Sequence, residues 1–90
     1  NKPYCWGANS TGTIGDNTSG TNRLAPTAVI VSGALNGLTV KSIAESNYTN
    51  TTFGFASDNN FYSWGSYLLG NLGNNASANS LTPALVNPPF

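Results

Sequence analysis

Few residues in this chain have the chemistry needed for catalysis. The carboxylates are Asp16, Glu45 and Asp58, the one thiol is Cys5, and there is no histidine. Without an imidazole, neither a Ser-His-Asp triad nor a Cys-His pair can form from these residues, and the usual general base is missing. The sequence therefore predicts a non-catalytic protein with no cofactor.

The carboxylates do not group into a metal site. Asp58 stands in Ser-Asp-Asn-Asn at residues 57–60, a run of turn-forming residues, and we expect it to shape that turn. Residues 16–20, Asp-Asn-Thr-Ser-Gly, superficially suggest a calcium loop. One carboxylate among neutral oxygens is a weak ligand set for Ca²⁺. We therefore predict no bound metal.

The composition is polar but nearly uncharged. Hydrophobic residues make up 39% of the 90 residues and charged residues only 7%, against roughly a quarter charged in ordinary soluble domains. Asn, Ser, Thr and Gly fill the difference, which is typical of secreted or cell-surface β-proteins. The aromatic and β-branched residues are too many for a disordered chain.

The charges exclude two classes of partner. Lys2, Arg23 and Lys41 are spread along a chain of net charge zero, so the cationic footprint that binds nucleic acid is missing. Adsorption to an anionic membrane surface is disfavoured for the same reason. The longest purely apolar run, residues 28–31, is far too short for membrane insertion.

An internal repeat organises the chain. Tyr-Cys-Trp-Gly at residues 4–7 recurs as Tyr-Ser-Trp-Gly at residues 62–65. A shift of 58 residues also superimposes two Gly-rich loops, at residues 12–15 and 70–73. After one deletion, Pro-x-x-Val follows in both copies, at residues 26–29 and 83–86. Fixed-period similarity of this kind is the signature of repeat architectures.

Three strands are expected between the copies, at residues 40–44, 52–56 and 61–64, and no helix is supported. A hairpin centred on Asp58 places Phe55 opposite Phe61. The other predicted pairs are Phe53 with Ser63, Gly54 with Tyr62, and Thr52 with Trp64. Because both faces carry large apolar groups, we expect both to be covered. The predicted repeat core is Tyr4, Trp6, Phe53, Phe55, Phe61, Tyr62 and Trp64.

These motifs resemble the regulator of chromosome condensation repeats. The pattern that carries the resemblance is residues 51–65, continuing through the Gly-rich loop and Pro-x-x-Val, with a partial copy at residues 6–29. The chain departs from the pattern where Thr51 replaces a His and Asn59 a turn Gly. Thr13 and Asn71 replace a Gln. Asn tolerates positive φ, so Asn59 can still form the turn.

The resemblance implies an all-β fold of tandem four-stranded antiparallel blades, as in a β-propeller or a propeller-like stack. Residues 1–31 would supply the second half of one blade, with its last two strands and Gly-rich loop. Residues 32–90 would supply one complete blade with its loop. About one and a half blades cannot close a ring. We therefore expect an excerpt of a longer propeller, or a unit that stacks on copies of itself.

The resemblance also bears on Cys5. Extracellular-type members of this family often carry one Cys at this position and another across the hairpin, where the second copy has Phe53 and Ser63. A disulfide partner would then lie just upstream of Asn1. The alternative is a buried free thiol. A catalytic role is disfavoured because no His is present to activate the thiol.

Two further features are candidate sites. Tyr67, Leu68 and Leu69 replace a segment that is polar in the first copy. They either pack under a neighbouring loop or form an interaction surface. Asn-x-Ser/Thr sequons are only slightly more frequent than chance, so glycosylation depends on the host. The candidate asparagines are Asn9, Asn17, Asn47, Asn50 and Asn75.

The functional prediction is a non-catalytic extracellular scaffold, structural or protein-binding, whose partners are neighbouring repeats, copies of itself or another protein. One alternative is a target-recognition module that binds a protein through its loops, as an inhibitor does. Another is a glycan-binding surface that uses the aromatic residues. The charged surface that nucleotide-exchange or chromatin-binding roles would use is missing.

Overall fold

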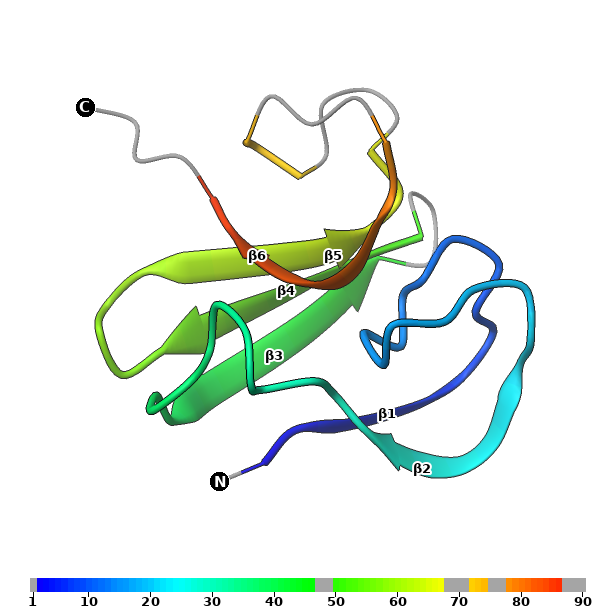
Figure 1. Ribbon diagram of the computed structural model, residues 1–90, viewed down its shortest axis with the longest axis horizontal. Coiled ribbons are helices and arrows are strands. Elements are labelled where there is room, and N and C mark those ends of the chain that lie inside the picture. The colour runs from blue at the N-terminus through cyan, green and yellow to red at the C-terminus, as the bar shows by residue number, and fades with distance from the viewer. Residues whose placement is uncertain (1, 47–49, 68–71, 75–77, 87–90) are drawn as a thin grey trace.

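The computed structural model describes residues 2–46, 50–67, 72–74 and 78–86. Its fold is all-β, as predicted, with two antiparallel sheets (Figure 1). The first sheet pairs β1 (Tyr4–Gly7) with β2 (Arg23–Ala28). The second has the order β3-β4-β5-β6, and its strands are β3 (Val40–Ser46), β4 (Thr51–Ala56), β5 (Phe61–Gly65) and β6 (Ser80–Leu85). No helix in this part of the chain is long and apolar enough to cross a membrane.

The central hairpin has the predicted register. The Cα partners of β4 and β5 include Thr52 with Trp64, Phe53 with Ser63, Gly54 with Tyr62, and Phe55 with Phe61. Asp58 forms the turn by accepting hydrogen bonds from the backbone N–H of Asn60 and from the Tyr62 hydroxyl, at 3.1 and 2.8 Å. Asn59 has φ of 65°, which confirms that it takes the left-handed turn position usually held by Gly.

The pairs β1–β2 and β5–β6 share one register. Both are interrupted by an irregularity just before a Gly with strongly positive φ, 107° at Gly7 and 106° at Gly65. Such irregularities bend a strand and re-aim its side chains. The matching Cα partners are Tyr4 with Ala28 and Tyr62 with Leu85, Cys5 with Thr27 and Ser63 with Ala84, and Gly7 with Arg23 and Gly65 with Ser80.

The core lies where the first half of the chain meets one face of the four-stranded sheet. Trp64 is fully buried, and its indole N–H donates to the carbonyl oxygen of Thr13 at 2.9 Å. The hydroxyl of Thr52 donates to the same oxygen at 2.8 Å. The buried apolar cluster consists of Val29, Leu35, Ala56, Tyr62 and Trp64. The Gly-rich loop after β1 therefore packs directly on the second sheet (Figure 1).

The other face of that sheet is covered at one end only, where Thr51 and Ser63 are fully buried and the Ser63 hydroxyl donates to the carbonyl oxygen of Leu72 at 2.8 Å. Phe53 and Phe55 are half-buried and Phe61 is 57% exposed. The expectation that both faces are covered therefore holds only in part among the described residues, and the placement of Phe61 in the core is wrong. Side chains alternate between the two faces of a strand, and only the face of Trp64 meets the first half. The Phe55 and Phe61 rings pack on each other, with centroids 4.9 Å apart.

The first Tyr-x-Trp motif is also outside the core. Tyr4 is 51% and Trp6 is 60% exposed, whereas their counterparts Tyr62 and Trp64 are buried. The prediction of a core position for Tyr4 and Trp6 is thus wrong. Among the described strands β1 is hydrogen-bonded only to β2, and no described glycine meets the Trp6 ring as Gly15 meets that of Trp64.

Candidate functional site

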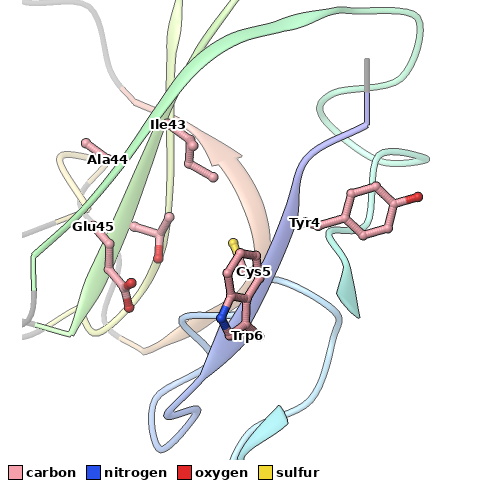
Figure 2. A pocket seen from close by; sticks show the side chains of 7 residues that line it. Tyr4, Cys5, Trp6, Ile43, Ala44 and Glu45 are labelled. Atoms are coloured by element: carbon pink, nitrogen blue, oxygen red, sulfur yellow. The ribbon is translucent and has the colours of Figure 1, made fainter. Parts of the chain in front are cut away.

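A groove lies between the two sheets. Its volume is about 370 Å³, which lies toward the small end of the range for ligand sites, about 300–1,000 Å³. One wall comes from β1 and the other from β3, with one residue from β4 (Figure 2). The lining residues are Tyr4, Cys5, Trp6, Ile43, Ala44, Glu45 and Thr52.

The groove follows the unpaired edge of β1. One edge of β1 is bonded to β2, and β1 lies between β2 and β3 in the fold (Figure 1). The wall opposite is the edge strand β3, where Ile43 is 43% exposed. In Figure 2 the Tyr4 ring points away from β3, whereas Cys5 lies between β1 and β3. The site thus combines a free strand edge with an apolar wall and one carboxylate, Glu45.

Cys5 is a free, half-buried thiol that packs against the core cluster. Burial, and after it the negative charge of Glu45, raise the pKa of this thiol to about 11. Cys5 is therefore protonated at neutral pH, whereas a nucleophilic Cys needs a lowered pKa. Its environment does not activate it. The sequence given holds no second Cys, so the alternative of a disulfide with an upstream Cys remains a prediction.

Asp16 is held by its own loop. Its carboxylate pairs with Arg23 Nε at 2.8 Å and accepts hydrogen bonds from the backbone N–H and hydroxyl of Thr18. Burial alone would raise the pKa of Asp16, but these hydrogen bonds and the Arg23 charge together hold it below its ordinary value. The Asp16 carboxylate therefore holds its own loop together through Arg23 and Thr18. Across the described residues no three His, Cys, Asp or Glu side chains come together as metal ligands.

Asp58 has the structural role predicted for it. The hydrogen bond from the Tyr62 hydroxyl, followed by those from Asn60, lowers the pKa of its carboxyl. The pKa of Tyr62 is raised, first by burial and then by its bond to Asp58. This pair fastens the hairpin turn to strand β5.

The sequon asparagines differ in accessibility. Asn9 is fully buried, and its side-chain amide donates to the carbonyl and hydroxyl oxygens of Thr18 at 3.2 and 3.0 Å. A glycan on that nitrogen is incompatible with this fold, so Asn9 is a structural residue of the Gly-rich loop. Asn17 and Asn50 are exposed, with positive φ. Asn47 and Asn75 lie outside the described residues.

Only one residue of the predicted loop patch can be placed. Tyr67 is half-buried, and its backbone N–H donates to the side-chain oxygen of Asn79 at 3.1 Å. Leu68 and Leu69 lie outside the described residues. An interaction surface at residues 67–69 therefore remains a prediction.

Sequence reasoning missed the groove altogether. Ile43, Ala44 and Glu45 form its far wall although they carry no motif. The sequence predicts a disulfide or a buried free thiol for Cys5 and a core position for Trp6. No local pattern signals this groove, because its two walls are distant from each other along the chain. No model of a known protein family matches this chain, and comparison with curated proteins finds no relative.

Proposed function

We propose that this chain is a non-catalytic extracellular scaffold, structural or protein-binding, whose blade-like sheets stack face to face into a larger propeller or a fibre. The resemblance to the regulator of chromosome condensation repeats supports this function. A composition with few charges also supports it, because electrostatic repulsion between copies of a chain with net charge zero is weak.

The observation that carries the proposal is the packing of the second sheet on the first half of the chain. Trp64 lies against the Gly-rich loop, where a Cβ on Gly15 would be 2.6 Å from its indole nitrogen. Leu81 of β6 lies equally close to Gly12, and its carbonyl accepts a hydrogen bond from the Asn17 N–H at 2.8 Å. One sheet thus docks through an aromatic and a Leu onto a glycine-rich loop.

In the first sheet, the side chains that correspond to Trp64 and Leu81 are exposed. We call Tyr4, Trp6 and Leu24 the leading face. They correspond by the repeat offset to Tyr62, Trp64 and Leu81. Trp6 is 60% and Leu24 is 95% exposed. Large apolar side chains at this exposure, grouped on one small sheet, favour a contact surface.

The complementary surface is partly exposed, since Phe61 is 57% exposed and Phe53 and Phe55 are half-buried. We call Phe53, Phe55, Phe61 and Gly73 the trailing face. A Cβ on Gly73 would be 3.0 Å from Val86 Cγ1, the same distance that separates a Cβ on Gly15 from Val29 Cγ1. Gly15 also meets the Trp64 ring, whereas among the described residues no atom other than Val86 Cγ1 lies within 4 Å of that point at Gly73. The leading face of a second copy would supply the missing ring.

Such a contact is heterologous, because two different surfaces meet. Repeating it generates a ring if the rotation closes and an open fibre if it does not. Analytical ultracentrifugation of the full chain over a range of concentrations tests this proposal. We expect association that increases with concentration and changes little with added salt, since the two faces carry almost no charge.

Variants sharpen the test. Leu24→Lys on the leading face and Phe61→Lys on the trailing face should each make the chain monomeric, because each would bury an unpaired charge in the contact. An equimolar mixture of the two variants retains one intact pair of faces, so it should stop at a dimer. Ile43→Lys is the matched control and should associate like the parent chain. Self-association of either face variant alone would refute the proposal.

A further inference from the structure

The connection between the two sheets carries a reactive dipeptide. We call residues 29–39, which join β2 to β3, the linker (Figure 1). The chain has fourteen asparagines, and Asn36 is the only one that is followed by a glycine. Asparagine is thermally labile, because its side-chain carbonyl carbon can be attacked by the backbone nitrogen of the next residue. Gly37 leaves that approach open, since it has no Cβ.

Both reacting groups are accessible in the folded chain. Asn36 and Gly37 are exposed, and nothing lies within 4 Å of the point where a Cβ on Gly37 would stand. Among the described residues, neither the Asn36 side chain nor the Gly37 N–H has a hydrogen-bond partner. The turn is closed by the Leu38 N–H, which donates to the carbonyl oxygen of Leu35 at 3.0 Å. Gly37 has φ of 77°, as its position in a type II turn requires. The attack thus needs only an exposed turn to rearrange.

Asn9 shows the opposite situation. Its side chain is fully buried, and its amide nitrogen donates to both oxygens of Thr18. Its side-chain oxygen accepts a hydrogen bond from the Ile14 N–H at 3.2 Å. A side chain held in this way cannot turn onto the following backbone nitrogen until the Gly-rich loop opens. Asn9 therefore provides an internal reference for protection by the fold.

We propose that Asn36 is a site of spontaneous modification, whose isoaspartyl product weakens the contact between the two sheets. The Gly37 nitrogen attacks the side-chain carbonyl carbon of Asn36 and gives up its proton. A new C–N bond closes a cyclic succinimide, the bond to the side-chain nitrogen breaks, and that nitrogen leaves with the proton as ammonia. Water then opens the ring at either carbonyl, which gives aspartate or isoaspartate. No oxidant or reductant takes part.

The place of Asn36 in the linker gives the modification its effect. Leu35 is 2% exposed and belongs to the buried cluster around Trp64, and Leu38 packs against that cluster. Asn36 and Gly37 thus lie between two side chains that anchor the linker in the core. Isoaspartate routes the backbone through the former side chain and adds one methylene between these anchors. Because the core is close-packed, Leu35 and Leu38 cannot both keep their contacts. Aspartate adds only a charge at an exposed position.

The first experiment compares modification in the folded and the unfolded chain. The full chain is incubated at mildly alkaline pH with and without urea and is then digested with trypsin. Cleavage after Arg23 and Lys41 releases residues 24–41, in which Asn36 is the only asparagine. Mass spectrometry and chromatography then measure the amide, aspartyl and isoaspartyl forms of each peptide.

We expect folding to protect Asn9 at least about tenfold more strongly than Asn36, because only Asn9 must wait for a loop to open. Protection is the rate in urea divided by the rate in the folded chain, so the different residues that follow Asn9 and Asn36 do not affect the comparison. Asn36→Gln should abolish the modification, since the longer side chain closes a ring much more slowly. Equal protection of Asn9 and Asn36, or aspartate at Asn36 without isoaspartate, would overturn the proposal.

The second experiment measures the effect on the fold. The isoaspartyl form is separated by chromatography and unfolded in urea beside the parent chain and Asn36→Asp, which supplies the charge without the added methylene. Asn36→Asp should unfold like the parent chain, whereas the isoaspartyl form should show an unfolding equilibrium constant about tenfold larger or more. Equal stability of the isoaspartyl form and Asn36→Asp would refute the proposed effect on the sheet contact. Both experiments use dilute protein, so their outcome is independent of self-association.

Discussion

The two tryptophans of the repeated motif provide the sharpest test of the structure. Trp64 is fully buried and donates a hydrogen bond to Thr13, whereas Trp6 is 60% exposed. The substitution Trp64→Phe removes that hydrogen bond and leaves a void beside Gly15. The substitution Trp6→Phe changes a ring that is largely in solvent. One chemical change, made at two copies of one motif, should therefore have two different effects on the free energy of unfolding.

The magnitude follows from the contacts. A lost hydrogen bond costs about 1 kcal/mol. The carbonyl of Thr13 still accepts a bond from Thr52, so it is not left unpaired. The smaller ring adds about 1–2 kcal/mol for the void, which gives about 2–3 kcal/mol for Trp64→Phe. Trp6→Phe should stay within about 0.5 kcal/mol, as exposed substitutions do.

Urea denaturation monitored by circular dichroism measures both values, at protein concentrations low enough to keep the chain monomeric. With a slope of about 1.5 kcal/mol per molar urea, Trp64→Phe should lower the midpoint by about 1–2 M, and Trp6→Phe should barely move it. Equal shifts for the two variants would refute the packing described for the Gly-rich loop. A large shift for Trp6→Phe alone would show that the first motif is the one that lies in a core.

Three other substitutions or titrations test separate parts of the structure. Gly15→Ala should destabilise the fold by about 2–4 kcal/mol, because its φ is +80° and the new Cβ would meet a buried ring, whereas Gly54→Ala should be neutral or slightly stabilising in urea melts. Burial and the charge of Glu45 raise the pKa of Cys5 to about 11, so the rate of its reaction with a small disulfide should keep rising up to about that pH. In the unfolded chain the rate should level off near the ordinary pKa of a thiol, about 8.5. A plateau at the same pH in both states would contradict the burial of Cys5. The folded-state pKa of Asp16 is depressed, so its stabilising effect is present above its unfolded pKa of about 3.9 and is lost as the pH falls through the folded value. Stability measured against pH should thus drop more steeply in acid for the parent chain than for Asp16→Asn, and parallel curves would exclude this contribution of the pair with Arg23.

The sequence by itself determined the all-β class and the central hairpin. Alternation in residues 52–56 and 61–64, together with the turn-forming run around Asp58, was enough to place Phe55 opposite Phe61, because register in a hairpin depends on local turn geometry and on a side-chain period of two. Asn59 could be assigned to a positive φ for the same local reason. The repeat offset also anticipated which residues would correspond between the two halves.

Only the tertiary structure decided which copy of each motif is buried. Tyr4 and Trp6 belong to the same Tyr-x-Trp-Gly motif as Tyr62 and Trp64. Burial, however, depends on what lies across the sheet, and the Gly-rich loop of the first half covers only the second copy. Sequon spacing likewise could not show that the Asn9 amide is enclosed by its own loop.

The groove belongs wholly to the tertiary structure. Its walls come from β1 and β3, which are separated by more than thirty residues of chain and are brought together by the core around Trp64. Composition and motifs describe what a residue is, and strand pairing follows from local patterns. Whether an edge is free, and what faces it, depends on the placement of segments that are distant in sequence, and no local pattern carries that information.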